Sequence, residues 1–399
     1  MTWRRNVYAI TAASFLGYTG FTLVMPFLPL FIGQLGVTDI GQVAMWTGVS
    51  LGVTPGLTAI LAPAWGRLGD RYGRKIMVER SLISFVVLMG AMAFVTRPWH
   101  VLALRIVQGL FAGYGSLSVA MAAESAPRDR MPQAIGLVQT AQRLGPGVGP
   151  VIGGALAGLV GLRRAFIGTA LFYAVGLVVV FWFYDERAID AQRRASPAVA
   201  ESGRVTFRSV LTFQNFVLMM AVIFGLQFVD RSFGPVLPLY VEQIGVAHGN
   251  VAVVSGVLFS IMAATGALGH HFCGRLLQRY PARLVIAGGA AAAALGSGLL
   301  GAGGFWVLVV ASAILGIGIG AAMTAAYSAA GSVIPVGAHG AGFGVLTSAS
   351  LVGMASSPFI AGVLGGASIR AVFFVDLAIM AALAALVYKT MEPGERQQG

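Results

Sequence analysis

Charge is scarce in this sequence, and cysteine is almost absent. Asp, Glu, Lys and Arg make up only 10% of the 399 residues, whereas soluble globular domains contain roughly 25%. The single cysteine, Cys273, excludes an intrachain disulfide and a thiolate metal cluster. The chain also lacks the H-E-x-x-H pattern of zinc peptidases and the G-x-x-x-x-G-K-S/T loop of ATPases. We therefore expect a protein that is not an enzyme and uses neither metal nor cofactor.

Long apolar runs take the place of charge. Hydrophobic residues form 57% of the chain, and the mean hydropathy is +0.83. Runs long enough to cross a hydrocarbon core of about 30 Å recur along almost the whole length. We predict an all-α integral membrane protein that crosses the cell inner membrane with twelve transmembrane helices. The spans are predicted near residues 7–32, 44–65, 76–95, 101–122, 134–158, 165–184, 213–241, 252–272, 284–304, 305–329, 342–365 and 370–389.

Basic residues outnumber acidic ones, which gives a formal charge of +12. They lie at the ends of the predicted spans rather than in one patch, so we expect contact with the lipid bilayer and no nucleic-acid partner. Most lie on the side of the two termini, and the opposite side carries Arg97, Arg163, Arg164 and Arg370. Because positively charged loops stay in the cytoplasm, both termini are predicted to be cytoplasmic.

The sequence contains an internal repeat. The basic stretch Gly66–Lys75 recurs in degraded form as Gly274–Arg283. Other residues recur at the same spacing: Asn6, Pro26, Pro29, Gln34 and Gly36 correspond to Asn215, Pro235, Pro238, Gln243 and Gly245. We predict two parallel six-helix bundles, residues 1–184 and 209–399, related by a pseudo-two-fold axis and joined by a cytoplasmic linker, residues 185–208. Such repeats are typical of alternating-access transporters that hold substrate between the halves.

Three motifs resemble those of a known family. The major facilitator superfamily has a signature loop after helix 2, which resembles Gly66, Asp70, Arg71, Gly73 and Arg74, and a helix 4 motif, which resembles Arg105, Gln108 and Gly109. Its drug:proton antiporters carry the helix 5 pattern G-x-x-x-G-P-x-x-G-G, which fits Gly145, Gly149, Pro150, Gly153 and Gly154. The resemblance covers essentially the whole chain. The helix 5 pattern implies export. Within this group the chain is most similar to MdtG-type multidrug efflux proteins, over Thr22–Leu30, Gln34–Val37 and Met45–Trp46.

The resemblance assigns conformational roles to two of these motifs. It implies that Asp70 forms a latch with neighbouring cations, through charge-assisted bonds that break as the halves separate. Alternatively, the cations of this loop only fix the topology. In helix 5, glycines four residues apart allow close packing and Pro150 removes a backbone donor, which predicts a hinge. Tight packing alone is the alternative, and repetition of the pattern in residues 342–365 favours an interface between the halves.

A few charged residues lie within the predicted spans, where each costs a few kcal/mol unless it is paired or wetted. Asp230 and Arg231 point about 100° apart on a helix, so we expect that they do not simply neutralise each other. The family plan implies that Asp230 and Arg105 face each other across the cavity. We hypothesise that Asp230 carries the coupling proton and that Arg105 modulates its ionisation. The alternative is that Asp230 forms a permanent buried pair with Arg105 or Arg143 that fixes helix packing. Asp376 is a second, more structural candidate.

The predicted cavity combines aromatic, polar and basic side chains, as expected of a small-molecule pocket. Its candidates are Tyr18, Thr22, Gln108, Tyr114, Arg143, Gln227, Arg231 and Tyr327. Residues 7–32 contain no carboxylate, so neutral or anionic amphiphiles suit this cavity better than strongly cationic drugs. We predict a monomeric secondary transporter that exports small amphiphilic molecules by proton antiport. The alternative is an exporter of one metabolite, such as a sugar, an amino-acid derivative or a metal-chelating product.

Overall fold

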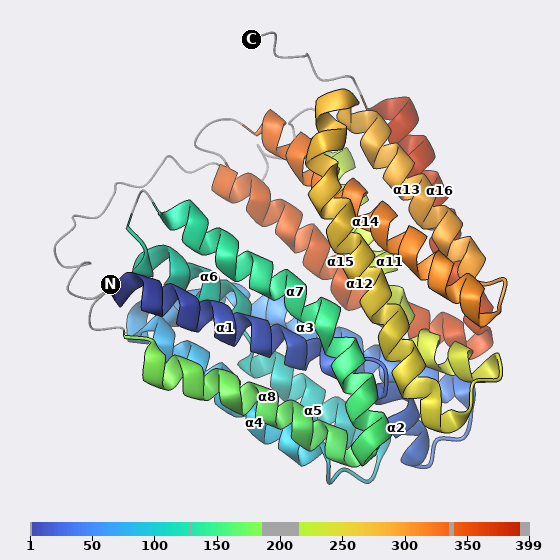
Figure 1. Ribbon diagram of the computed structural model, residues 1–399, viewed down its shortest axis with the longest axis horizontal. Coiled ribbons are helices and arrows are strands. Elements are labelled where there is room, and N and C mark those ends of the chain that lie inside the picture. The colour runs from blue at the N-terminus through green and yellow to red at the C-terminus, as the bar shows by residue number, and fades with distance from the viewer. Residues whose placement is uncertain (1, 128–129, 186–214, 335–338, 392–399) are drawn as a thin grey trace.

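The computed structural model describes residues 2–127, 130–185, 215–334 and 339–391, and every regular element in these ranges is a helix (Figure 1). The predicted linker therefore lies outside the described residues, apart from Asp185. The helices are α1 (Thr2–Leu23), α2 (Leu28–Gln34), α3 (Ile40–Tyr72), α4 (Arg74–Met92), α5 (Pro98–Phe111), α6 (Tyr114–Ser125), α7 (Met131–Val160), α8 (Leu162–Phe183), α11 (Phe216–Gln243), α12 (His248–Arg279), α13 (Ala282–Leu300), α14 (Phe305–Val333), α15 (His339–Ala367) and α16 (Ile369–Thr390).

Each predicted span coincides with a helix or with a pair of helices. Among the described residues, 10 spans can cross a membrane by length and composition, with α5 and α6 counted as one, and the pair α1 and α2 adds an eleventh. The pair is bent by 46°, where Pro26 and Pro29 remove backbone donors. The remaining helix, α4, carries Arg74, Lys75 and other charges in its first two turns.

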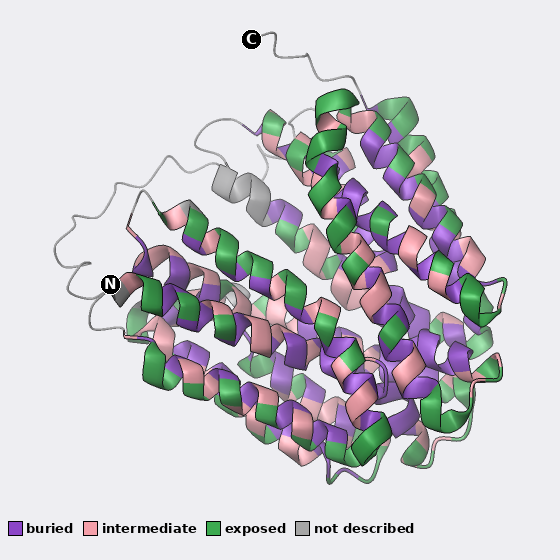
Figure 2. Cartoon of the chain, in the orientation of Figure 1, coloured by how far each residue is buried: buried purple, intermediate pink, exposed green. Residues whose placement is uncertain are grey.

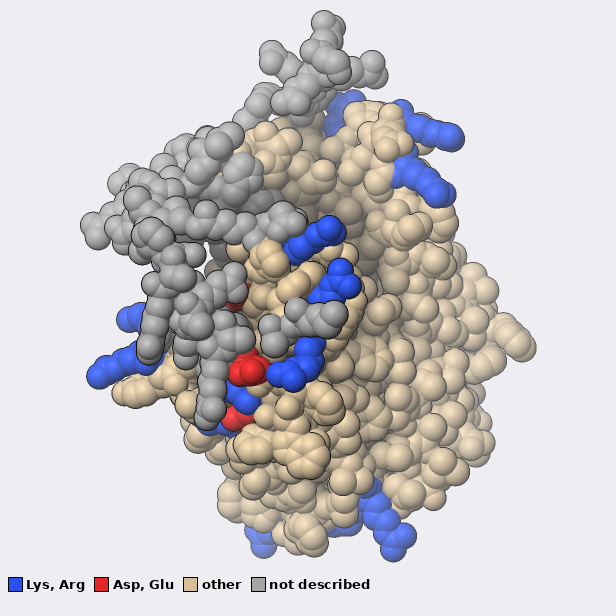
Figure 3. All heavy atoms as spheres, turned by 60° about the vertical axis from the view of Figure 1, so that its left-hand side comes forward, with Lys and Arg blue, Asp and Glu red and all other residues tan. Residues whose placement is uncertain are grey.

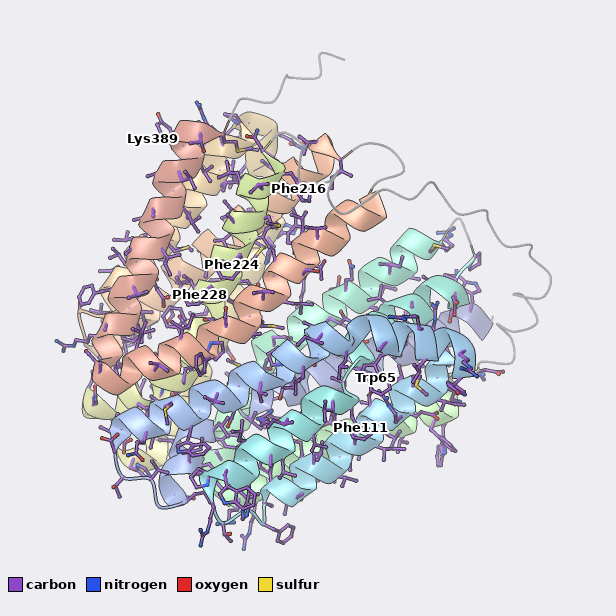
Figure 4. The ribbon with its side chains drawn as sticks, turned by 180° about the vertical axis from the view of Figure 1, so that it is seen from behind. Trp65, Phe111, Phe216, Phe224, Phe228 and Lys389 are labelled. Atoms are coloured by element: carbon purple, nitrogen blue, oxygen red, sulfur yellow. The ribbon has the colours of Figure 1, made fainter. Side chains whose placement is uncertain are left out.

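A break divides the fourth predicted span into α5 and α6. At the break Gly113 has a φ of 124°, a conformation that favours glycine. Side chains of α4 satisfy the carbonyl groups that end α5: Arg80 Nη2 donates to Phe111 O at 3.0 Å, and Ser81 Oγ donates to the same oxygen at 2.9 Å. The Arg80 guanidinium also lies 3.5 Å from the centroid of the Trp65 ring, and Figure 4 shows Trp65 and Phe111 in the same bundle.

The helices form two bundles (Figure 1). In the first, α1 packs against α7 and α8, α3 against α5, and α4 against α8. In the second, α14 packs against α12 and α13, α11 against α15, and α13 against α16. The bundles meet along two helix pairs, α3 with α15 and α7 with α12. Figure 1 shows them diverging toward the side on which α1 begins and α16 ends, which we call the terminal side.

Glycines allow the bundles to approach closely on the side opposite the termini. A Cβ on Gly48 of α3 would lie 3.0 Å from Gly362 Cα of α15 and would collide with the Pro358 carbonyl oxygen. A Cβ on Gly256 of α12 would collide with the Pro150 carbonyl oxygen of α7. Small residues at such contacts allow backbone packing between membrane helices. We call these two contacts the glycine seam.

The outer surface is apolar. Leu159, Phe94 and Trp306 are 84%, 77% and 76% exposed, and Figure 2 shows exposed residues on the outward faces of the helices and buried ones between them. In Figure 3 a broad band without charged side chains covers the right of the view, and Lys and Arg lie toward its upper and lower edges. This distribution suits a belt of lipid around the molecule.

Candidate functional site

A cavity of about 210 Å³ lies where the two bundles meet. The first bundle supplies most of its wall, and the second contributes Arg231 from α11 and Leu351 and Met354 from α15. The other lining residues are Gly17, Tyr18, Phe21, Thr22, Thr54, Pro55, Thr58, Phe85, Gln108, Ala112, Gly113, Tyr114, Gly115, Gln142, Pro146 and Tyr173. Apolar and aromatic walls with a few polar groups are typical of small-molecule sites.

Five of the eight predicted cavity residues line this cavity: Tyr18, Thr22, Gln108, Tyr114 and Arg231. The rings of Tyr18 and Tyr114 lie 6.4 Å apart between centroids. Glycine makes room for Tyr114, because a Cβ on Gly17 would lie 2.6 Å from its Cε1 atom.

The other three predicted cavity residues do not line it. Arg143 is exposed and lies 3.4 Å from His270 of α12, measured from Nη1 to Nε2. His270 Nδ1 in turn lies 2.6 Å from Thr324 Oγ1 of α14. Gln227 lies on α11 beside Gly353 of α15. Tyr327 is half-buried on α14.

A smaller pocket of about 30 Å³ adjoins the cavity. The pocket and the cavity share Phe21, Thr54, Pro55, Arg231 and Met354. The pocket alone is lined by Met25, Leu51, Arg105 and Pro358. Guanidinium groups from both bundles therefore border one small space.

Arg105 is the largest fully buried side chain of the described residues, with 2% exposure. Its Nη1 donates to Gln108 Oε1 at 2.9 Å, one turn along α5. Within the described residues its Nε and Nη2 have no hydrogen-bond partner. Thr54 Oγ1 of α3 donates to the Arg105 carbonyl oxygen at 2.8 Å and so fixes the backbone of this turn.

The structure pairs Asp230 with Arg231 rather than with Arg105. Arg231 Nε lies 3.1 Å from Asp230 Oδ2, and the two side chains are 21% and 36% exposed. The expectation that these neighbours do not neutralise each other was therefore wrong. Their Cβ atoms point in different directions, but the long arginine side chain folds back toward the carboxylate. In this conformation the Asp230–Arg105 pair is not formed.

Asp376 lies apart from the cavity, on α16. It is 1% exposed, and its Oδ2 lies 2.5 Å from Ser232 Oγ of α11. Within the described residues its Oδ1 has no hydrogen-bond partner and no Lys or Arg forms an ion pair with the carboxyl group.

The predicted latch lies at the terminal end of α3, where Gly66 to Tyr72 are helical and only Gly73 forms the turn. Gly73 has a φ of 99°, and its N–H donates to Gly69 O at 3.0 Å. Arg74 pairs with Glu124 of α6 at 3.2 Å, within the same bundle, and Arg71 is exposed. The Asp70 side chain lies outside the described residues.

The glycines of the predicted helix 5 motif lie on α7 and face two different partners. Gly145, Gly149 and Gly153 pack against α1, and a Cβ on Gly145 would lie 2.8 Å from Thr19 N. That strip is therefore a contact within one bundle, and the expected interface between the halves was wrong for it. A four-residue spacing shows a flat helix face but not which helix covers it. Gly154 and Pro150 do face α12, where a Cβ on Gly154 would lie 3.0 Å from Val253 Cα.

Comparison with known proteins identifies the family. The profile of the Major Facilitator Superfamily matches residues 10–297 and 248–399. The chain belongs to the major facilitator superfamily. A relative named "Multi-drug resistance efflux pump PmrA homolog", from Lactococcus lactis subsp. lactis (strain IL1403), is 32% identical over 289 residues, which cover 72% of this chain and 70% of that protein. "Multidrug resistance protein MdtG" from Proteus mirabilis (strain HI4320) is 32% identical over 278 residues, which cover 70% of this chain and 68% of that protein.

Solved structures of other transporters share the fold. A bacterial homolog of the human lysosomal transporter Spinster, in an inward-facing and occupied conformation, gives a TM-score of 0.77 at 15% identity over 96% of this chain and 95% of that chain. A D-xylose-proton symporter gives a TM-score of 0.75 at 12% identity, over 98% of this chain and 99% of that chain. The predicted all-helical superfamily fold and the MdtG-type resemblance are confirmed. The protein is a multi-span membrane transporter of this superfamily and not an enzyme.

Several residues of the site escaped the sequence analysis. Thr54 and Thr58 line the cavity from α3, and their spacing by one helical turn in a predicted span was a usable signal. Tyr173 lines it from α8, and no local pattern marked it. The contacts of Ser232 with Asp376 and of His270 with Thr324 each join residues that are far apart in the chain.

Proposed function

We propose that this superfamily member exports small amphiphilic molecules across the inner membrane by proton antiport with alternating access. The observation that carries the proposal is the cavity of aromatic, polar and basic side chains between the bundles, next to interfaces that glycines keep flat. The names of the efflux relatives support the direction of transport. We further propose that the protein acts as a monomer, with residues 1–184 and 209–399 as the moving units and both termini in the cytoplasm.

Alternating access requires the glycine seam to separate. In the described conformation, α3 and α15 pack closely on the side opposite the termini, as do α7 and α12. Opening the cavity to that side means breaking these contacts while the terminal ends of the bundles approach each other. In our proposal Asp70, in the last turn of α3, acts as the latch of the state closed at the terminal side, and Gly149 and Pro150 belong to the hinge.

Asp230 is our candidate for the proton-carrying group. Its ionised carboxylate neutralises Arg231, which lines both the cavity and the adjoining pocket. Protonation of Asp230 leaves Arg231 as an unpaired cation at the cavity wall. Arg105 offers this carboxylate a second partner in the other bundle if the bundles rearrange. Proton binding therefore changes the charge that a substrate meets, which couples the two ligands. Asp376 remains the second candidate, in a more structural position.

Liposomes containing the purified protein test the proposal. An imposed inward proton gradient should accelerate efflux of a preloaded fluorescent amphiphile. Asp230→Asn should abolish the acceleration but retain substrate exchange without a gradient, because Asn has the shape and the zero charge of the protonated carboxyl group. Asp39→Asn is the matched control, since Asp39 accepts from Gln42 N at 2.8 Å as the N-cap of α3 and Asn caps equally well. Full gradient-driven efflux by Asp230→Asn would refute the assignment.

A competition panel in the same liposomes decides between multidrug export and the alternative of a single metabolite. Inhibition of dye efflux by many unrelated amphiphiles supports a broad range of substrates. Inhibition by one sugar, amino-acid derivative or chelating compound alone would favour the specific exporter.

A further inference from the structure

Arg105 presents two unused hydrogen-bond donors beside the cavity. Its Nη1 is engaged by Gln108 at 2.9 Å, whereas Nε and Nη2 are buried and have no hydrogen-bond partner among the described residues. These two nitrogens form the edge of a guanidinium that binds both oxygens of a carboxylate, sulfonate or phosphate. The free edge thus has the shape of a bidentate anion receptor.

The charge of the adjoining pocket also favours an anion. Arg105 and Arg231 both line its space of about 30 Å³. Among the described side chains, Asp230 is the one carboxylate that pairs with either of them. Two guanidinium groups and one carboxylate leave an excess positive charge, and the Arg105 guanidinium is buried, where an uncompensated ion is costly. A bound anionic group would remove that excess.

The walls show what kind of molecule carries the anion. Phe21, Met25, Leu51 and Met354 border the pocket, and the larger cavity beyond them holds Tyr18 and Tyr114. The pocket has room for a head group of a few atoms, and the cavity has room for an apolar body. Burial of that body supplies non-specific affinity.

We propose that Arg105 binds the anionic head group of the substrate, through Nε and Nη2, while the apolar body of the substrate occupies the larger cavity. The substrate class is therefore aryl or alkyl organic anions. This inference rests on the proposed function, because it names the substrates of the proposed exporter. It assigns Arg105 a role in substrate binding in addition to its proposed contact with Asp230.

Three probes of one shape test the inference by calorimetric titration of the purified full-length protein in nanodiscs, without any gradient. They are naphthylacetate, its neutral analogue naphthylacetamide, and cationic naphthylethylammonium. We expect naphthylacetate to bind roughly tenfold more tightly than the amide, and the cation to bind least. Arg105→Gln should weaken naphthylacetate binding by roughly 10-fold to 100-fold, the loss expected for a charge-assisted pair, and should leave amide binding within about twofold. Arg105→Lys should fall between, since lysine keeps the charge but loses the bidentate edge.

Arg164→Gln is the charge-matched control, because Arg164 is exposed at the start of α8, outside the cavity lining. The Arg164→Gln protein should bind all three probes as the parent protein does. Equal affinity of the parent protein for the carboxylate and the amide would overturn the inference, and that comparison needs no variant to fold. Retained anion affinity in Arg105→Gln would overturn it as well.

The outcomes separate this inference from the proposed function. Tight anion binding without gradient-driven efflux supports Arg105 as the receptor and contradicts antiport. Gradient-driven efflux of neutral dyes with no preference for anions supports antiport and contradicts the receptor.

Discussion

A single methyl group in the glycine seam should change which side of the transporter is open. In Gly48→Ala the new Cβ would collide with the Pro358 carbonyl oxygen and lie 3.0 Å from Gly362 Cα. Both are backbone atoms, so relief requires α3 and α15 to move apart. Overpacking of this kind costs about 1–3 kcal/mol, and only the conformation that contains the seam bears that cost. The equilibrium should therefore shift by roughly 5-fold to 150-fold toward the state that is open opposite the termini.

Spin-label distance measurements can detect this shift in a Cys273→Ser background. Leu159 and Trp306 are exposed residues at the ends of helices on the side opposite the termini, one in each bundle. Tyr72 and Tyr280 are the corresponding exposed residues on the terminal side. In Gly48→Ala the longer Leu159–Trp306 distances should gain population while the Tyr72–Tyr280 distances shorten.

Gly288→Ala is the matched control for the seam variant. It adds the same methyl group to α13, where a Cβ would meet nothing within 4 Å, and its distance distributions should equal those of the parent protein. Unchanged distributions in a folded Gly48→Ala protein would refute the view that the seam sets the closed side.

Three further predictions concern stability, and a fourth concerns coupling. Arg80→Gln should lower the free energy of unfolding by about 2–4 kcal/mol, because it removes a charged cap on the α5 carbonyl groups and the contact with Trp65. Thermal melting followed by tryptophan fluorescence would measure this loss. An unchanged Tm would contradict the prediction. Ser232→Ala should lower the free energy of unfolding by about 1–3 kcal/mol, because it leaves the buried Asp376 carboxyl group without its partner. Asp376→Asn should retain gradient-driven efflux. Loss of efflux from a folded Asp376→Asn protein would make Asp376 the coupling group. In a double-mutant cycle of Arg143→Gln and His270→Ala, the two losses of unfolding free energy, measured by thermal melting, should differ from additivity by about 0.5 kcal/mol, as expected for an exposed pair. Strict additivity would show that the contact contributes no stability.

The sequence predicted the helices because a membrane imposes a length and an apolar composition on each span. The bend between α1 and α2 was not predicted, although Pro26 and Pro29 lie where it occurs. The break between α5 and α6 was not predicted, because its cap comes from Arg80 and Ser81 on a different helix. A single Gly113 within an apolar run does not reveal that partner.

Pairing of side chains was harder to predict than their location. Asp230, Arg231 and Arg105 were singled out because charge within a span is rare, and the structure places Arg105 and Arg231 at one pocket. Which of the two arginines holds Asp230 depends on side-chain reach, which helical angles do not describe. Arg143 was expected in the cavity for its charge, but its place on α7 directs it to His270 instead.

Proton release on substrate binding tests the central claim of antiport most directly. A weakly buffered solution of the purified protein with a pH-sensitive dye would report protons as a transported neutral amphiphile is added at a series of pH values. We expect about one proton to leave the parent protein per substrate bound and none to leave Asp230→Asn. Saturating substrate binding without proton release at any pH would contradict antiport through this cavity.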